Sequence, residues 1–352
     1  MKASSTIICA DPKTGRLSED TAKRYFSLLG FGVFSMSVVT YLTQLLLMVA
    51  LMNLAPSLAS STLVLTVISF LGLYGFGLPC LLLALRRLPK AVPTRQKTSP
   101  AFVFGGLLIS FACVLAGNSV SSLLLSLAQS LLGVSPLNPV EVTLSGGTFW
   151  LNLAATALLA PILEELIFRK LLCDRLLPLG EGYAVVLSAC IFALFHGNFY
   201  QLFYAFLIGL CFAYVYVKSG RLSLSILFHV AINLLFGVLP QLITEHLDLE
   251  TVATLSAEWL AGSEEAFEAL TRLLSGPAMI PAVGYVLIGQ IQSVGAMAGS
   301  ILLSVLLFRR KLTLEKGSLL MPEGHTVSPV FLNFGVALSI AFFCLQLILS
   351  LL

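Results

Sequence analysis

Long apolar runs recur along the whole chain, and they constrain its fold more than any other feature. Each run is near or above the roughly 20 apolar residues that an α-helix needs to cross a bilayer. Because lipid offers backbone groups no water, such spans must be helical or closed barrels. The sequence therefore predicts an all-α, polytopic transmembrane helical bundle of about 8–9 spans. We place them at about 26–52, 62–85, 101–125, 148–172, 182–198, 200–217, 221–239, 279–308 and 329–351.

Charged residues are scarce and are concentrated between the spans. Of 352 residues, 58% are hydrophobic and 11% are charged, whereas an average soluble domain has roughly 25% charged residues. The net charge of +3 comes from the loops and requires no nucleic-acid partner. We therefore expect a protein of the cell membrane whose surroundings are the lipid bilayer.

The distribution of basic residues predicts the orientation of the chain. In a nine-span arrangement, 19 of the 20 Lys and Arg residues fall on one side. Basic loops face the cytoplasm, so the N-terminus is expected to be cytoplasmic. The basic residues lie in the N-terminal segment, in 86–97, in 169–175, at 218 and 221, and in 309–316.

One long polar segment, 241–276, lies on the opposite side and is acidic. It carries seven Asp and Glu residues against the single Arg272. Its apolar positions, among them Trp259 and Phe267, recur at partly helical spacing, which predicts one or two surface helices. Two interpretations stay open, a solvated connecting loop or a lid over an outer opening.

These features divide the chain into five regions. We predict a cytoplasmic N-terminal segment (1–25), peripheral transmembrane helices (26–147), a core that carries the polar motifs (148–240), the acidic extracytoplasmic loop (241–276) and C-terminal transmembrane helices (277–352).

A few polar residues lie inside the apolar spans of the predicted core. An ionisable side chain near the middle of a span costs about 2.5 to 3.5 kcal/mol on insertion scales, so such groups are usually paired, cavity-facing and functional. This cost makes them the candidate functional residues. They are Glu164, Glu165 and Arg169 in one span, His196 in a second, and His229 with Asn233 in a third.

Helical spacing gives the two adjacent glutamates different surroundings. Glu165 and Arg169 are four residues apart, on one face of a helix, where they can form an ion pair. Glu164 points about 100° away from Glu165. We therefore predict a structural ion pair at Glu165 and Arg169. Glu164 is left as a carboxylate suited to general-base catalysis, although both glutamates could instead pair with nearby basic residues.

The histidines are expected to meet Glu164. Glu164 precedes the turn near Gly180 by about as many residues as separate that turn from His196, so antiparallel helices place them at similar depth. His229 and Asn233 are one helical turn apart and face the same way. A carboxylate, two imidazoles and an amide can therefore converge on one polar cavity that holds a water or a metal ion.

The ordered motifs make a family resemblance specific. Glu-Glu-x-x-x-Arg, Phe-x-x-x-His and His-x-x-x-Asn occur in this order on successive hydrophobic segments. Together they resemble the CAAX prenyl protease and bacteriocin-processing family of intramembrane endopeptidases, over about 148–240. The residues that carry the resemblance are Glu164, Glu165, Arg169, Phe192, His196, His229 and Asn233.

The resemblance implies hydrolysis of a peptide bond in a membrane-associated protein or peptide. Carried over by position, Glu164 would activate water, and His196 and His229 would be metal ligands or oxyanion stabilisers. Asn233 would donate a hydrogen bond to the tetrahedral intermediate. Two mechanisms stay open. Either Zn²⁺ or another divalent metal is held by His196, His229 and Glu164, or a glutamate acts without metal.

Other classes of function remain as alternatives. A haem-binding electron carrier would use His196 and His229 as axial ligands but leaves Glu164 unexplained. A non-proteolytic scaffold, immunity protein or transporter would use the polar cluster as an ion path. The motifs lie between the middle and the cytoplasmic half of their helices, which favours cytosolic or lateral access of substrate.

Further polar residues lie outside the motifs. Asn198, Tyr200 and Gln201 either line the mouth of the cavity or cap a helix end. His246 and His325 lie in loops and are expected to be solvated.

Overall fold

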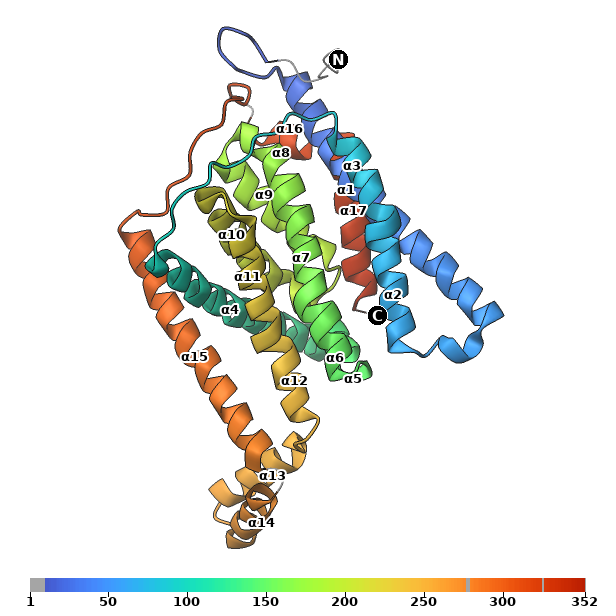
Figure 1. Cartoon of the computed structure of the whole chain (residues 1–352), viewed down its shortest axis with the longest axis vertical. Coiled ribbons are helices and arrows are strands. Elements are labelled where there is room, and N and C mark those ends of the chain that lie inside the picture. Colours follow the sequence, from blue (N-terminus) through green and yellow to red (C-terminus); the bar gives the residue numbers. More distant parts are fainter. Residues whose placement is uncertain (1–9, 277–278, 325, 352) are drawn as a thin grey trace.

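The protein is a bundle of helices without a β-sheet in the part of the chain that the structure describes (Figure 1). This structure is a computed structural model that describes residues 10–276, 279–324 and 326–351, so His325 lies outside it. Seven helical stretches are long and apolar enough to cross a membrane, and two shorter apolar helices accompany them within these residues. The predicted all-α, multi-pass fold is confirmed.

The helices follow the predicted spans closely. The first half contains α1 (Glu19–Leu54), η1 (Pro56–Leu58), α2 (Thr62–Phe70), η2 (Leu71–Gly77), α3 (Leu78–Leu85), α4 (Pro100–Leu132), α5 (Pro139–Gly146), α6 (Phe149–Asn152), η3 (Leu153–Leu159), α7 (Ala160–Glu165), η4 (Leu166–Cys173), α8 (Asp174–Leu176) and η5 (Leu177–Leu179). The second half contains α9 (Glu181–Phe195), α10 (Phe199–Ser219), α11 (Leu222–Asn233), η6 (Leu234–Val238), α12 (Leu239–Thr244), α13 (Leu249–Leu260), α14 (Glu264–Ser275), α15 (Met279–Phe308), α16 (Ser328–Phe331) and α17 (Phe334–Leu349).

Two predicted spans are too short to cross a bilayer upright. Helix α9 has 15 residues and α17 has 16, whereas a crossing of about 30 Å takes about 20 residues. Helix α9 ends at Phe195, and the chain turns back through Gly197 into α10, which begins at Phe199. The turn after α9 therefore lies inside the bundle, at the depth of the polar motifs.

Three proline residues explain wide π-helical turns within the long spans. Proline has no N–H and its ring clashes with the carbonyl four residues earlier, so a helix must widen or bend before it. Pro79, Pro161 and Pro240 each lie two residues beyond a π-helical turn, η2, η3 and η6 respectively. Two of these turns adjoin the motif helices α7 and α11.

Helix α10 is the centre of the motif-bearing core. It packs against α4 on one side and α9 on the other. A Cβ at Gly117 of α4 would collide with the backbone of Tyr204, and one at Gly209 of α10 would lie 3.1 Å from Ala189 Cα. Small residues allow this close approach between membrane helices. The resulting core holds the helix ends that carry the polar side chains.

The basic segments gather at one end of the bundle, which is the upper end in Figure 1. The backbone N–H of Ala91 donates to Asp174 O (2.8 Å) and that of Gln96 donates to Ser219 O (2.9 Å). Lys218 pairs with Glu181, which also accepts a hydrogen bond from the backbone N–H of Glu315 (2.8 Å). Loops far apart in the sequence are therefore tied together at this basic end.

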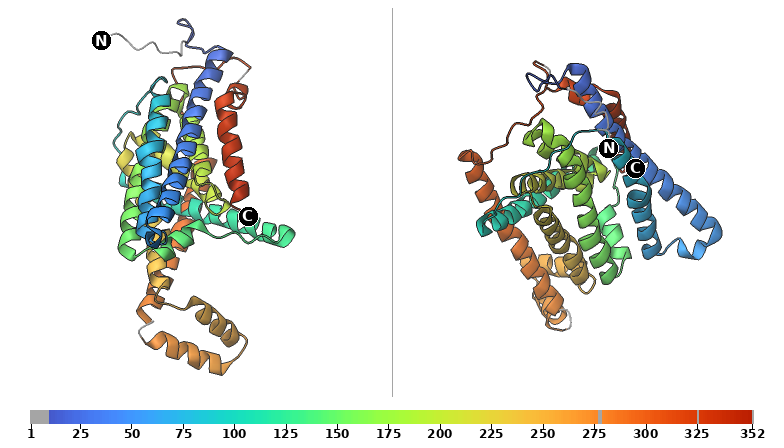
Figure 2. Two further views of the ribbon diagram at one scale, coloured as in Figure 1. Left: turned by 90° about the vertical axis from the view of Figure 1, so that its right-hand side faces the viewer. Right: turned by 45° about the horizontal axis from the view of Figure 1, so that its top comes forward.

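The acidic segment forms two helices and not an irregular connecting loop. Helices α13 and α14 pack against each other, and Asp248 and Ser263 cap their N-termini by accepting hydrogen bonds from Thr251 N and Ala266 N. We call these two helices the acidic hairpin. It projects beyond the end of the bundle opposite the basic end (Figure 2). His246, just before the hairpin, is exposed.

Candidate functional site

Four helical segments bring the motif residues together inside the bundle. Glu164 and Glu165 end α7, and Arg169 follows in the wide turn η4. His196 directly follows α9, while His229 and Asn233 lie on the second half of α11. The separation along the chain is large, yet side chains from all three predicted motifs contact one another or line one cavity.

Glu165 and Arg169 form an ion pair that is completely removed from solvent. Arg169 Nε lies 3.1 Å from Glu165 Oε2, and both side chains are 0% exposed. The contact has ion-pair distance but not hydrogen-bond alignment, so Nε and Oε2 have no hydrogen-bond partner among the described residues. A second donor, Arg169 Nη1, bonds Ser188 Oγ at 3.1 Å, and Ser188 Oγ donates to Phe168 O at 2.9 Å.

Aromatic rings enclose the buried guanidinium. Arg169 Cζ lies 5.0 Å from the ring centroid of Phe192 and 5.9 Å from that of Phe212. A desolvated guanidinium over an aromatic ring gains a cation–π interaction of about 2 kcal/mol. Phe192, the aromatic residue of the second motif, therefore supports Arg169 as well as the histidines.

His229 connects the buried pair to Glu164. Its Nδ1 lies 3.0 Å from Glu165 Oε1, and its Nε2 lies 3.7 Å from Glu164 Oε2. Because a carboxylate accepts, Nδ1 carries the hydrogen of this contact. Glu165 thus fixes the tautomer and orientation of His229 toward Glu164.

Glu164 differs from its neighbour by facing open space. Its side chain is 20% exposed, whereas that of Glu165 is 0% exposed. The two adjacent carboxylates therefore have separate surroundings, one in a dry ion pair and one on a cavity wall. This is the division that the helical spacing predicted.

His196 is oriented by its own helix. Its Nδ1 lies 2.8 Å from Phe192 O, and a carbonyl can only accept, so Nδ1 is the donor and Nε2 is the free nitrogen. The Phe192 ring lies edge-on to both imidazoles, with centroid distances of 4.8 Å to His196 and 5.7 Å to His229. Phe192 therefore contacts both histidine rings.

A wide turn explains the position of Asn233. In η3 the N–H of Ala160 bonds Ala155 O, five residues back, so the carbonyl of Thr156 would need the N–H of residue 161. That residue is Pro161, which has no N–H. Asn233 Nδ2 donates to this carbonyl instead, at 2.9 Å.

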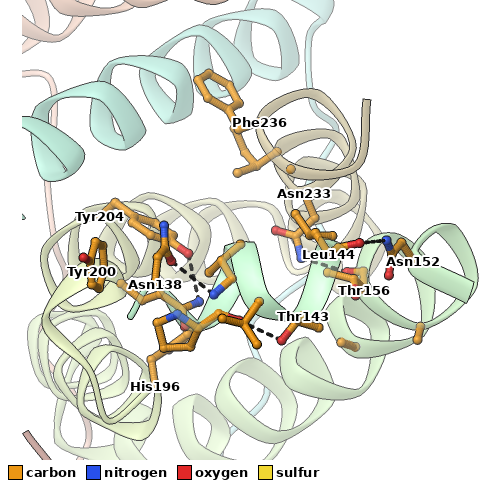
Figure 3. A pocket seen from close by; sticks show the side chains of 18 of the residues that line it. Asn138, Thr143, Leu144, Asn152, Thr156, His196, Tyr200, Tyr204, Asn233 and Phe236 are labelled. Atoms are coloured by element: carbon orange, nitrogen blue, oxygen red, sulfur yellow. Dashed lines mark hydrogen bonds between the residues drawn. The ribbon is translucent and has the colours of Figure 1, made fainter. Parts of the chain in front are cut away.

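These side chains line a cavity of about 950 Å³ (Figure 3). In the close-up, His196, Tyr200 and Tyr204 lie on one side of it, and Asn233, Thr156 and Asn152 lie on the other. The size is at the upper end of the range for pockets that hold organic ligands. The cavity also admits water to the carboxylate of Glu164.

The residues beyond His196 have two roles. Tyr200 and Gln201 line the cavity, and Tyr200 OH donates to Pro136 O at 2.8 Å. Asn198 instead caps α10, since its Oδ1 accepts from Gln201 N at 3.0 Å. Two expectations came from the sequence, and each holds for different residues. Tyr200 and Gln201 line the cavity, and Asn198 caps a helix.

A metal site is not formed by the expected donors in this arrangement. Within the described ranges, no three His, Cys, Asp or Glu side chains come close enough together to hold a metal ion. His196, His229 and Glu164 share the cavity, and Nδ1 of each imidazole is bonded to a carboxylate or a carbonyl, which leaves Nε2 of each ring toward the cavity. In this arrangement the three expected donors are not gathered as closely as in a three-ligand zinc site, and the metal set stays a prediction.

Sequence reasoning missed several residues of the site. Ser188 lies at four-residue spacing before Phe192 and His196, and Tyr204 follows Tyr200 at the same spacing. This periodicity is a signal that could have found both. Phe212 and Thr156 carried no such signal, because their roles depend on how α10 and η3 pack.

Comparisons with known proteins point to one family. Residues 146–235 match the family model described as type II CAAX prenyl endopeptidase Rce1-like. The chain is also similar to the membrane-embedded CAAX protease MroQ of Staphylococcus aureus (strain USA300), with 26% identity over 152 residues. That alignment covers 41% of this chain and 61% of the relative, so about three fifths of the relative's length is matched. No solved structure matches the chain.

The matched segment coincides with the part of the fold that carries the site. It runs from the end of α5 to η6 and contains Glu164, Glu165, Arg169, His196, His229 and Asn233. The flanking helices α1–α4 and α15–α17 lie outside the family model. Within this multi-pass membrane protein, residues 146–235 match the Rce1-like CAAX prenyl endopeptidase model, which confirms the resemblance that the three motifs indicated.

Proposed function

We propose that the protein is an intramembrane endopeptidase that hydrolyses a peptide bond in a membrane-associated protein or peptide. The observation that carries this proposal is the division between the adjacent carboxylates. Glu165 is bound by Arg169 and His229, whereas Glu164 faces a cavity that can hold water. A carboxylate that faces water and is not bound in an ion pair with Arg or Lys is suited to act as a general base.

Glu164 activates the attacking water in this proposal. It takes a proton as the water oxygen bonds to the carbonyl carbon of the scissile peptide. The carbonyl oxygen becomes an oxyanion. When the C–N bond breaks, the proton held by Glu164 passes to the leaving amine. General acid–base catalysis of this kind contributes about 10²- to 10⁴-fold to the rate.

The remaining motif residues position the water and stabilise the oxyanion. His229 lies 3.7 Å from Glu164 and keeps a tautomer fixed by Glu165. We assign His229, His196 and Asn233 to orienting water and stabilising the oxyanion, because all three line the cavity beside Glu164. Preorganised hydrogen-bond donors act strongly where bulk water is excluded.

The competing functions receive less support. An ion path gives no reason for the different surroundings of the two adjacent carboxylates, one in a dry ion pair and one on the cavity wall. Axial haem ligands must face each other across the macrocycle, and Phe192 contacts both imidazoles. The hydrolase is the function that uses the whole cluster.

The partners and orientation belong to the same proposal. The substrate is a polypeptide that reaches the bilayer, and the N-terminus of the protein is cytoplasmic because the basic end gathers at that side. The structure brings these basic segments to one end, as the positive-inside rule requires.

The test compares newly formed peptide termini in membranes of cells that express wild-type protein or Glu164→Gln. The variant removes the base and keeps the shape, so we expect cleavage products to fall by about 10²- to 10⁴-fold. Glu264→Gln, on the exposed face of the acidic hairpin, is the matched control and should cleave like wild type. Equal terminus profiles for wild type and Glu164→Gln, at equal expression, would refute the proposal.

A further inference from the structure

The cavity lies on one side of the catalytic glutamate. On α10 its lining residues fall between Tyr200 and Ile208, the first half of the helix. On α9 only Phe192 and His196, at the end of the helix, contribute. On α4, which runs from Pro100 to Leu132, the lining begins only at Val114. In each case these are the helix portions remote from the basic end.

The basic side of the glutamate is closed by packed side chains. The ion pair of Glu165 and Arg169 is 0% exposed. Beyond it Phe168, Phe212 and Phe228 are fully buried, and no lining residue of the cavity comes from this layer. The lining of the cavity therefore does not continue past the ion pair toward the basic end.

The two ends of the bundle carry opposite charges. The end toward which the cavity extends carries Glu141 on α5 and the acidic hairpin, with Arg272 as its single basic residue within the described residues. The other end holds the basic loops, which are expected to be cytoplasmic. The cavity therefore opens toward the extracytoplasmic end.

The chemistry of the lining is polar but almost uncharged. Glu164 is the one carboxylate among the described lining residues, and no Lys or Arg is among them. Side-chain amides and hydroxyls instead supply donors and acceptors that match a peptide backbone. Six that illustrate this lining are Asn118, Ser122, Asn138, Thr143, Asn152 and Thr156.

We infer that the substrate reaches Glu164 from the extracytoplasmic end, as an uncharged stretch of polypeptide that continues past the scissile bond. This inference rests on the proposed endopeptidase function. A substrate that ended a few residues beyond the cut would bring a terminal carboxylate into a cavity whose lining has no cation to pair with it. The inference also replaces the cytosolic or lateral access that helix depth alone favoured.

The side of access is testable by cysteine labelling without knowledge of the substrate. In a background in which the seven native cysteines are replaced, Thr143→Cys places a thiol on α5 at the exposed cavity wall. A membrane-impermeant maleimide is then applied to intact cells and to inverted membrane vesicles. Glu258→Cys on the acidic hairpin and Lys311→Cys at the basic end, both exposed, report the orientation.

We expect Thr143→Cys and Glu258→Cys to be labelled in intact cells, and Lys311→Cys only in inverted vesicles. Labelling of Thr143→Cys from the same side as Lys311→Cys would overturn the inference. Labelling of Glu258→Cys only in inverted vesicles would overturn it too, because the hairpin end would then be cytoplasmic. Should Thr143→Cys fail to fold, Ser122→Cys on α4 supplies a second thiol in the lining.

A measurement of cleavage after cysteine modification distinguishes a failure of this inference from a failure of the proposed function. Modification of Thr143→Cys by the impermeant reagent in intact cells should reduce product termini to the level of Glu164→Gln, whereas modification of Glu258→Cys should leave them unchanged. Unchanged cleavage after complete modification of Thr143→Cys would count against this route. Absence of any Glu164-dependent cleavage in wild type would defeat the endopeptidase proposal, while the labelling pattern would still locate the opening.

Discussion

Two Glu–Arg pairs in this protein have the same spacing and the same length but opposite surroundings. Glu165 and Arg169 lie 3.1 Å apart with both side chains 0% exposed. Glu268 and Arg272, on the acidic hairpin, also lie 3.1 Å apart in an i, i+4 pair, with exposures of 69% and 80%. The first is held inside the membrane-spanning core and the second in solvent, so their consequences for the protein differ.

The difference shows that burial, and not spacing, decides what such a pair does. Removing one partner of a buried pair leaves an uncompensated charge, whereas an exposed pair is screened by water. The buried pair also orients His229 through Glu165 Oε1 and encloses Arg169 between aromatic rings. Among the described residues, the exposed pair has only the hydrogen bond within the pair itself.

Breaking the buried pair is the largest expected effect on stability. Glu165→Gln should destabilise the folded protein by about 3–5 kcal/mol, because Arg169 remains charged in a dry environment. The measurement is unfolding of the purified protein in detergent. The double variant Glu165→Gln with Arg169→Met removes both charges and should recover part of the loss. A Glu165→Gln protein as stable as wild type would show that the pair does not support the fold.

Removing the hydroxyl that bonds the guanidinium should have an intermediate effect. Ser188→Ala leaves Arg169 Nη1 and the carbonyl of Phe168 without their partner, which costs about 1–3 kcal/mol. Ser304→Ala is the matched control, since Ser304 is exposed on α15 and bonds only its own helix at Ser300 O. Equal melting temperatures for the two variants would contradict the role given to Ser188.

Breaking the exposed pair should have the smallest effect. Glu268→Gln is expected to change stability by less than about 1 kcal/mol, and any change should diminish as salt is added. The same unfolding assay at low and high salt measures it. A salt-independent loss comparable to that of Glu165→Gln would show that the acidic hairpin is integral to the core.

The comparison extends to the neighbouring carboxylate. Glu164 is adjacent to Glu165 in sequence, yet its loss should affect cleavage and leave the core intact, because it faces the cavity and lies 3.7 Å from His229. Stability and catalysis are thereby assigned to consecutive residues. A helical rotation of about 100° between them is sufficient for this separation.

Much of the site follows from spacing along the sequence. The i, i+4 relation predicted that Glu165 meets Arg169 and that Glu164 faces elsewhere, and the ordered motifs indicated the family whose model residues 146–235 match. The catalytic roles and the domain boundaries stay predictions. The contact of His229 with Glu165 was not foreseen, because nothing in one helix fixes the rotation of another.

The wide turns show a further limit of local reasoning. Pro161 is visible in the sequence, and its missing N–H predicts a disturbed helix. That the freed carbonyl of Thr156 is bonded by Asn233 could not be predicted, since the two residues are brought together only by the packing of η3 beside α11.

The sequence by itself determined that this chain is a helical, multi-pass membrane protein, because apolar length and backbone hydrogen bonding in lipid permit little else. It also determined which polar residues are functional candidates, since their burial in lipid is costly. Only the tertiary structure decided how His229 contacts both carboxylates, and toward which end the cavity extends. Those properties depend on how separate helices pack against one another. That packing is determined by contacts between residues far apart in the sequence.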